Sequence, residues 1–229
     1  HYIIDYKGEL LDNLVANLTK LEDITKFQIL QDRKYLAKGE VISYADVVKI
    51  LPAFAHEESY IVNQALNQIF SELDIFIDDE STTEKSYKSL VGKVFAKNYA
   101  RLGWEKKAGE SAGDETLRGT VLSRTLYSEN PEAVEKASEI YAAHKDNVAT
   151  IPADIRPIVL NNEIKTSNSA ELVASYMDTY VKTSLQELKR ELAAAVANVR
   201  DEAAIKGLLE DFKNADIVKP QDIAFSWFY

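Results

Sequence analysis

The pentapeptide HEESY, His56 to Tyr60, begins like the zinc-binding sequence H-E-x-x-H of metallopeptidases. In that motif two histidines one helical turn apart reach one Zn²⁺, and the glutamate acts as general base. Here the fifth position is Tyr60, and the other histidines, His1 and His144, are far away in the sequence. Because a catalytic zinc needs three protein ligands, HEESY is predicted to be an exposed helix start and not a metal site.

A second short motif, Gly109-Glu110-Ser111-Ala112-Gly113, matches the pattern G-x-S-x-G of serine hydrolases. That nucleophile elbow needs a strand before its serine, whereas this segment follows a predicted helix that ends near Gly103. No G-K-S/T sequence follows the glycines, which excludes the common nucleotide-binding loop. The pattern favours a loop here, and a serine hydrolase that uses Ser111 is the weakest of three functional hypotheses.

Arg118 and Arg156 stand in nearly apolar helical runs, where a charge needs a partner. The runs are Leu117–Leu122 and Ile155–Leu160. An arginine in such a run is usually tied to a carboxylate or a helix end, and less often lines a ligand cavity. Glu115 and Asp154 are candidate partners. Both arginines are therefore candidates for a substrate-lining role, with a structural role favoured.

The composition is that of a globular protein, with 46% hydrophobic and 28% charged residues. The net charge of −10 and the scattered basic residues give no reason to expect nucleic acid or an anionic membrane as partner. The sequence has no cysteine, which fits a reducing compartment. It also has no apolar run of the roughly 18 residues that a membrane span needs, and no signal-peptide pattern. We expect a cytoplasmic protein.

Helical periodicity dominates and predicts an all-α fold. Helices are predicted near residues 9–20, 24–38, 43–54, 57–77, 83–101, 114–127, 131–147, 153–163, 169–182, 184–198, 200–213 and 219 to the end. Pairs of helices recur roughly every 35 to 45 residues, which favours a HEAT/armadillo-like superhelical stack of antiparallel helix pairs. A compact helical bundle is the alternative. The polar residues Asn63 and Glu191 are assigned to the water-facing sides of their helices.

Capping residues mark several helix boundaries. Lys38-Gly39 is predicted to end a helix, and Asn130-Pro131 to start one. Three further pairs place a capping side chain three residues before an acid. They are Ser43 with Asp46, Asn168 with Glu171, and Ser184 with Glu187. Tyr2–Tyr6 has the composition of a strand but no partner strand. Residues 106–115 are predicted to be a loop, and a possible elbow, within a single domain.

A succession of short elements along nearly the whole chain carries a family resemblance. They are Gln31-Asp32-Arg33, Leu36-Ala37, Gly39, Ile42-Ser43-Tyr44, Glu57 with Tyr60, Leu102-Gly103-Trp104, Gly109-Glu110, Leu117-Arg118 with Val121-Leu122, Ile151-Pro152-Ala153-Asp154-Ile155-Arg156 with Val159, and Gln221-Asp222. In this order and spacing they resemble the C-terminal helical domain of the aminopeptidase N family of zinc metallopeptidases, in particular its cytosolic members from lactic acid bacteria. Asn63 departs from the family, which often has tryptophan there.

The resemblance implies a domain without catalytic or metal-binding residues of its own. Zinc would belong to the parent enzyme, whose upstream catalytic and β-sandwich domains would be partners in the same polypeptide. The helical domain would close over the active site and wall a chamber for peptide substrates. Structural roles are expected at the family positions Gly103, Trp104, Glu110, Leu117 and Asp154.

The resemblance also suggests domain limits. Residues 1–7 would end a preceding β-sandwich or linker, and residues 8–229 would form the helical domain, cut short at its C-terminus. In that case the apolar ending would bury Trp227 or Phe228 against a neighbour. The alternative from another functional class is a free-standing α-solenoid adaptor that binds a partner protein.

Overall fold

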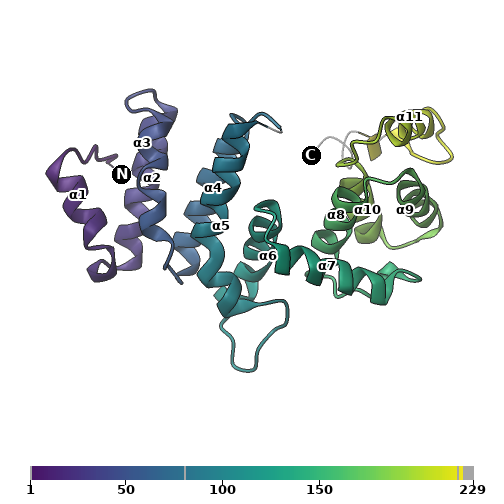
Figure 1. Cartoon of the computed structure of the whole chain (residues 1–229), viewed down its shortest axis with the longest axis horizontal. Coiled ribbons are helices and arrows are strands. Elements are labelled where there is room, and N and C mark those ends of the chain that lie inside the picture. Colours follow the sequence, from purple (N-terminus) through teal and green to yellow (C-terminus); the bar gives the residue numbers. More distant parts are fainter. Residues whose placement is uncertain (1, 80, 221, 224–229) are drawn as a thin grey trace. The chain divides into compact units, whose positions relative to one another are not determined.

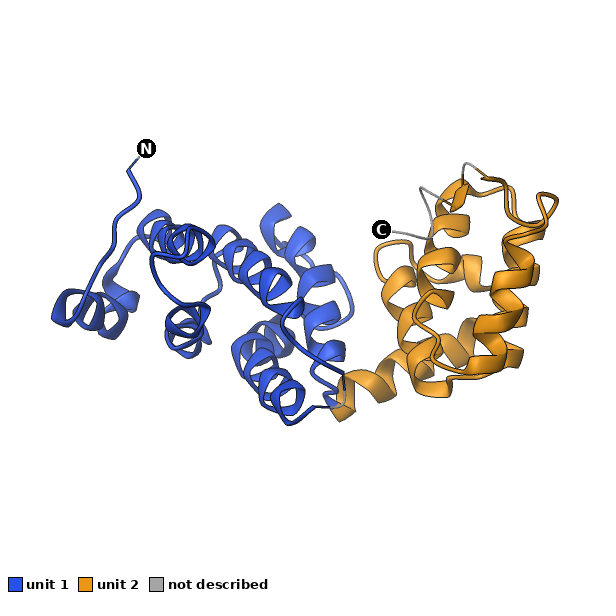
Figure 2. Cartoon of the chain, turned by 90° about the horizontal axis from the view of Figure 1, so that it is seen from above, with its two compact units in different colours: residues 1–130 blue, residues 131–229 orange. Residues whose placement is uncertain are grey.

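The computed structural model of the chain describes residues 2–79, 81–220, 222 and 223. Within these residues it contains helices, turns and loops and no β-strand, so the predicted all-α fold is confirmed (Figure 1). The chain separates into two compact units, residues 1–130 and residues 131–229 (Figure 2). The predicted elbow at residues 106–115 is wrong, because this loop lies inside the first unit and joins two tightly packed helices.

In the first unit, six α-helices and two 3₁₀ turns are described. They are α1 (Glu9–Ala16), η1 (Leu18–Lys20), α2 (Asp23–Lys38), α3 (Tyr44–Val48), η2 (Leu51–Phe54), α4 (Tyr60–Asp74), α5 (Thr82–Leu102) and α6 (Ala112–Tyr127). Helix α2 packs against α4, α4 against α6, and α5 against α6. The core between them contains Leu30, Leu66, Phe70, Phe95 and Leu122, each 0% exposed. Burying a side chain of this size contributes on the order of 2 kcal/mol, so this core holds the unit together.

The second unit is built in the same way. Its described elements are α7 (Pro131–His144), η3 (Val148–Thr150), α8 (Arg156–Ser167), α9 (Ala170–Lys182), α10 (Gln186–Val196) and α11 (Glu202–Asp211). Helix α8 packs against α7 and α10, and α9 packs against α10 and α11. As in the first unit, the main contacts join helices at most two positions apart in the chain, which is the pattern of a helical stack.

The predicted helices agree with the observed ones, and their differences have local causes. The prediction of a helix over 57–77 extends too far, since α4 ends at Asp74 and leaves Phe76 56% exposed. The predicted helix from 219 onward and the burial of Trp227 or Phe228 lie largely outside the described residues. The predicted strand at Tyr2–Tyr6 does not form, because the described residues include no other strand with which this segment could hydrogen-bond.

Three of the predicted helix boundaries lie where the sequence placed them. Ser43 and Asp46 form a complete capping box at the start of α3. Pro131 begins α7. Gly39 follows α2, but it has an ordinary φ of −86°, and Glu40 takes the left-handed conformation with φ 59°.

The other two predicted capping boxes are wrong. Ser169 caps α9, and the neighbouring Asn168 instead ends α8 in the left-handed conformation, which asparagine tolerates. Helix α10 begins after Leu185, which gives no side-chain cap, so Ser184 is not its cap. A capping residue can therefore be recognised by type while its position remains ambiguous by one residue.

Candidate functional site

Arg118, on the second turn of α6, is the centre of a buried group that we call the Arg118 cluster: Arg118, Glu110 and the carbonyls of Leu102 and Gly103. The side chain of Arg118 is 3% exposed and that of Glu110 is 4% exposed. Nη1 donates to the carbonyl of Leu102 at 2.6 Å and to that of Gly103 at 3.3 Å, and Nη2 pairs with the Glu110 carboxylate. The guanidinium therefore closes the end of α5 and the following loop onto α6.

The predicted partner of Arg118 was Glu115, and this prediction is wrong. Glu115 pairs with Lys106 at 2.8 Å on the exposed side of the loop. Its spacing of three residues would allow a contact with Arg118 on the helix surface, but its carboxylate turns to Lys106 instead. Glu110 lies in the loop, where the chain can fold back to bring its carboxylate to Arg118.

The family positions around this cluster have distinct contacts. Gly103 ends α5 with φ 61° and ψ −160°, a conformation available essentially only to glycine. Trp104 Nε1 donates to the hydroxyl of Tyr99 at 3.4 Å, and Leu117 is 0% exposed. Beside them Arg101 binds Asp114 at 2.7 Å and, through this hydrogen bond, lowers the pKa of the Asp114 carboxyl.

In the second unit, the Arg156 cluster consists of Arg156, Glu191 and the carbonyls of Ala149 and Ile151. Arg156 lies at the start of α8, and its side chain is 7% exposed. Nε and Nη2 bind both oxygens of Glu191 on α10, and Nη1 donates to the two carbonyls at 3.3 and 3.4 Å. The hydrogen bond to Glu191 raises the pKa of Arg156.

Two sequence predictions are corrected at this cluster. Asp154 was a candidate partner of Arg156, but it is exposed, and the partner is Glu191. Glu191 was assigned to the water-facing side of α10, yet its side chain is only 10% exposed. The helical periodicity places Glu191 among charged residues, and only the packing of α10 against α8 brings it to the arginine.

HEESY lies where three helices of the first unit meet. The Glu57 carboxylate accepts from Lys26 of α2 at 2.9 Å. Its backbone carbonyl accepts from Asn63 of α4 at 3.0 Å and from Asn98 of α5 at 2.8 Å. His56 is exposed. The glutamate of this segment therefore joins α2, α4 and α5.

These contacts also bear on whether HEESY could hold a zinc ion. Glu57 is already bound to Lys26, and a Zn²⁺ ion would need two further ligands beside His56. In the described part of the chain, no group of three or more His, Cys, Asp or Glu side chains could hold a metal ion. The residues around His56 do not fit a zinc ion.

The sequence did not indicate the burial of three polar residues, and for Asn63 the predicted water-facing position is wrong. Asn63 and Asn98 are 1% and 0% exposed, and Asn98 donates to Asn63 Oδ1 at 3.0 Å. Arg124 of α6 donates to Asn67 at 2.8 Å and pairs with Asp74 at 3.0 Å, which ties α6 to α4. Asn98 falls four residues from the buried Val94 and Leu102, so its place on an apolar stripe was a usable signal.

Ser111 is a helix cap. Its hydroxyl accepts from the backbone amide of Asp114 at 3.1 Å at the start of α6, after a loop and not after a strand. In this position its Oγ satisfies one of the free amides of the first turn. The geometry is therefore not that of a nucleophile elbow.

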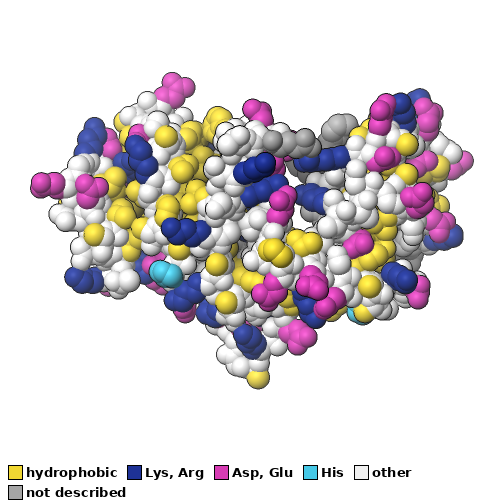
Figure 3. Space-filling model, viewed as in Figure 1, with side chains coloured by type: hydrophobic (Ala, Val, Ile, Leu, Met, Phe, Trp, Pro, Cys, Tyr) yellow, Lys and Arg dark blue, Asp and Glu magenta, His cyan; other side chains and the backbone are white. Residues whose placement is uncertain are grey.

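The face of the molecule shown in Figure 3 has no dominant charge. On the face shown in Figure 3, acidic and basic side chains are interspersed over the elements of both units. None of the described helices is both long and apolar enough to cross a membrane. The net charge of −10 is thus not gathered into a single acidic area on this face.

Each unit is thus a stack of packed helices that contains a buried arginine cluster. The family model described as "ERAP1-like C-terminal domain" matches residues 1–229, so the chain belongs to this family. It is 72% identical over its full length to aminopeptidase N of Lactococcus lactis subsp. cremoris, and 41% identical to aminopeptidase N of Lactobacillus helveticus. It is also 25% identical, over 96% of its length, to the puromycin-sensitive aminopeptidase of Caenorhabditis elegans.

The chain corresponds to only part of these relatives. It spans 27% of the length of the two bacterial aminopeptidases and 24% of the nematode one. The matched part is the C-terminal portion of the lactococcal protein. The predicted family resemblance is confirmed.

Proposed function

We propose that this chain serves as the helical lid and chamber wall of an aminopeptidase that removes N-terminal residues from peptides. The observation that carries the proposal is the match of the whole chain to the C-terminal portion of aminopeptidase N. The zinc ion and the catalytic residues would lie in other domains of the same polypeptide, which are then the immediate partners of the chain. The helical stack would limit which peptides reach them.

The two arginines are proposed to be structural within this domain and not to contact peptide. Arg118 and Arg156 each have their charge matched by a carboxylate and use further N–H groups on backbone carbonyls. An arginine that binds a substrate carboxylate needs free donors directed into a cavity. The same role is proposed for Gly103, Glu110 and Leu117, whose contacts support the α5–α6 connection.

The test compares the 229-residue chain with a full-length enzyme that contains it, both assayed with zinc on aminoacyl and peptide substrates. We expect hydrolysis only by the full-length enzyme. A further comparison replaces Arg118 or Arg156 by alanine in the full-length enzyme. Lower stability with unchanged selectivity among substrates of different length supports a structural role, and changed selectivity in a well-folded variant contradicts it.

The adaptor hypothesis makes a different prediction about the gene. A free-standing adaptor would have no H-E-x-x-H sequence encoded upstream of His1, whereas the aminopeptidase proposal requires one. A cytoplasmic location is also part of the proposal. It rests on the cysteine-free sequence and is tested by fractionation of cells that express the full-length protein.

A further inference from the structure

Arg33 differs from the other buried arginines, Arg118, Arg124 and Arg156, because its charge is poorly matched. Arg33 on α2 is 5% exposed. Its Nη1 donates to the carbonyl of Tyr6 at 3.3 Å, its Nη2 reaches the carbonyl of Asp46 only at 3.5 Å, and its Nε has no hydrogen-bond partner within the described residues. The nearest carboxylate, Asp5, is 3.7 Å away and binds Lys7 at 2.8 Å. A buried guanidinium in this state has unused donors.

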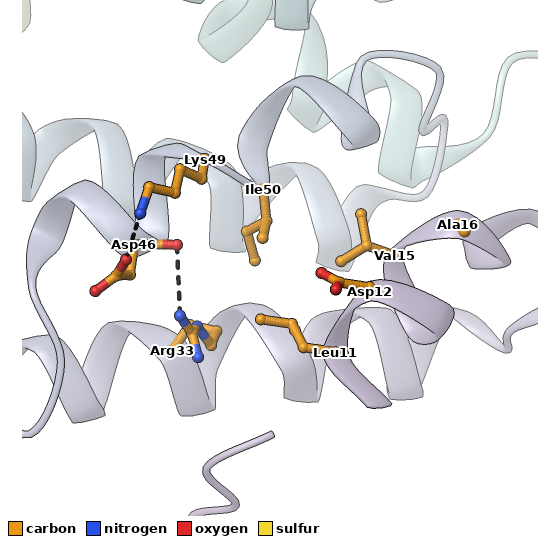
Figure 4. A pocket seen from close by; sticks show the side chains of 8 residues that line it. All are labelled: Leu11, Asp12, Val15, Ala16, Arg33, Asp46, Lys49 and Ile50. Carbon is orange, nitrogen blue, oxygen red and sulfur yellow. Dashed lines mark hydrogen bonds and ion pairs between the residues drawn. The ribbon is translucent and has the colours of Figure 1, made fainter. Parts of the chain in front are cut away.

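Arg33 lines a pocket of about 360 Å³ between α1, α2 and the α3 region (Figure 4). Four of the lining side chains are aliphatic and four are charged. They are Leu11, Val15, Ala16 and Ile50, and Arg33, Lys49, Asp12 and Asp46. This volume is near the lower end of the range for small-molecule sites. The pocket therefore suits a small ligand with an apolar body.

The charges of the lining indicate what kind of ligand would fit. Lys49 and Asp46 neutralise each other at 2.8 Å, and hydrogen bonds from Lys49 and Ser43 lower the pKa of Asp46 to about 2. The remaining lining charges are Arg33, which has only the ion pair with Asp5 at 3.7 Å, and the exposed Asp12, which has no ion pair in the described part of the chain. In Figure 4 they lie toward opposite ends of the pocket, with Leu11 and Ile50 between them.

We propose that this pocket binds a small aliphatic zwitterion of the size of an amino acid or dipeptide. The carboxylate would take the N–H groups of Arg33 Nη1 and Nη2 that the carbonyls of Tyr6 and Asp46 leave unused. The ammonium group would lie at Asp12, and the aliphatic side chain would contact Leu11 and Ile50. A simple anion would leave Asp12 unmatched, and a simple cation would leave Arg33 unmatched. Amino acids and dipeptides are also what an aminopeptidase releases or cleaves, and only this last link rests on the proposed function.

The weak packing of α1 is consistent with a site that opens to admit a ligand. None of its residues is buried, although Leu11 and Val15 line the pocket. The helix therefore closes one side of the pocket without contributing to the core. Ligand contacts with these side chains would add to the small number of interactions that hold α1 in place.

In the experiment, the 229-residue chain is titrated with L-leucine and with Leu-Leu. Calorimetry measures the heat of binding, and NMR measures the changes in amide chemical shift. We expect saturable binding of at least one of the two, with shifts in α1 and near Arg33. Leucinamide lacks the carboxylate, and 4-methylpentanoate lacks the ammonium group. Each should bind at least about tenfold more weakly than leucine. Peptidase activity is not needed, so this test is independent of the proposed function.

A pair of variants on one helix tests the position of the ligand. Asp12→Asn should weaken binding about tenfold, because it removes one charge-assisted contact. Glu9→Gln is the matched control, since it removes an exposed acid from the same first turn of α1 outside the pocket. Absence of saturable binding, equal affinity for 4-methylpentanoate, or equal weakening by both variants would each overturn the proposal. Because the analogues probe Arg33 without changing it, the test holds even if Arg33 variants do not fold.

Discussion

The Arg118 and Arg156 clusters solve the same problem in the two units with carboxylates from different places. Each arginine takes two backbone carbonyls from the segment before its own helix. Glu110 is eight residues from Arg118, within the loop that the cluster closes, whereas Glu191 is 35 residues from Arg156, on another helix. The first cluster therefore stabilises a local connection, and the second joins α8 to α10. A buried arginine in an apolar helical run can thus either close a loop or join two helices.

The largest loss of unfolding free energy is expected for Arg118→Met. The change leaves the Glu110 carboxylate, 4% exposed, without its cation and two carbonyls without a donor. Removing one partner of a buried ion pair costs about 3–5 kcal/mol. We expect a loss of unfolding free energy of this size for the first unit. It can be followed in urea by Trp104 fluorescence in a Trp227→Phe background, which leaves one of the two tryptophans.

A double variant sharpens this prediction. Arg118→Met combined with Glu110→Gln removes the stranded charge, so it should lose less stability than the sum of the single changes. Strict additivity of the two losses would mean that Arg118 and Glu110 do not act as one buried pair.

A smaller loss is expected for Arg156→Met. Glu191 is 10% exposed and is held on a helix surface, so its carboxylate can turn toward water when the arginine is removed. The expected loss of stability is about 2 kcal/mol. Hydrogen exchange should become faster in both α8 and α10, because the cluster joins these helices. The matched control is Arg190→Met on the exposed face of α10, with an effect within about 0.5 kcal/mol. Faster hydrogen exchange in α8 alone would contradict the conclusion that the Arg156 cluster joins α8 to α10.

This comparison also shows where sequence reasoning succeeds. The burial of both arginines was predicted from their apolar runs, and the helices from periodicity, because both signals are local in the sequence. The carboxylates predicted to pair with the two arginines, Glu115 and Asp154, were both wrong. Nothing near Arg156 in the sequence points to a residue 35 positions away, and Glu191 has the charged neighbours of a solvated face.

The poorly matched Arg33 shows a different limit. It was recognised only as part of a family element, since its environment is set by segments that fold together around α2: the residues before α1, α1 itself and α3. Asn98 marks the opposite case. It interrupts an apolar stripe in the sequence, so its burial could have been predicted, although its bond to the carbonyl of Glu57 could not.

A third prediction concerns helix caps that occur in both units. Ser111 and Ser169 each accept a backbone amide in the first turn of their helices, α6 and α9. Replacement of either serine by alanine should cost about 1 kcal/mol. The two losses should be similar, because the cap depends on local geometry and not on the arginine clusters. A fluorophosphonate probe should leave Ser111 unlabelled. Labelling that is lost in Ser111→Ala would support the serine hydrolase hypothesis instead.

The smallest effect expected is a dependence of stability on pH, with opposite sign for one carboxyl in each unit. In the first unit, Arg101 lowers the pKa of Asp114 below 3.8, so Asp114 stabilises the fold above that pH and loses this contribution as pH falls further. In the second unit, burial raises the pKa of Glu163 above 4.5, and the bond from Ser138 only partly offsets this. The folded state then holds the proton more tightly than the unfolded state. Stability of the second unit should rise as pH falls through the raised pKa toward 4.5.

Unfolding in urea at a series of pH values between 7 and 4.5 measures how the unfolding free energy of the second unit changes with pH. Glu163→Gln should remove the rise in stability on acidification, whereas Glu135→Gln, at an exposed position on α7, should keep it. The change should be well below the loss caused by Arg156→Met, because Glu163 retains a hydrogen-bond donor in Ser138. If Glu163→Gln leaves the slope unchanged, burial does not penalise the charge of Glu163, and the two units do not differ in how they hold these carboxyls.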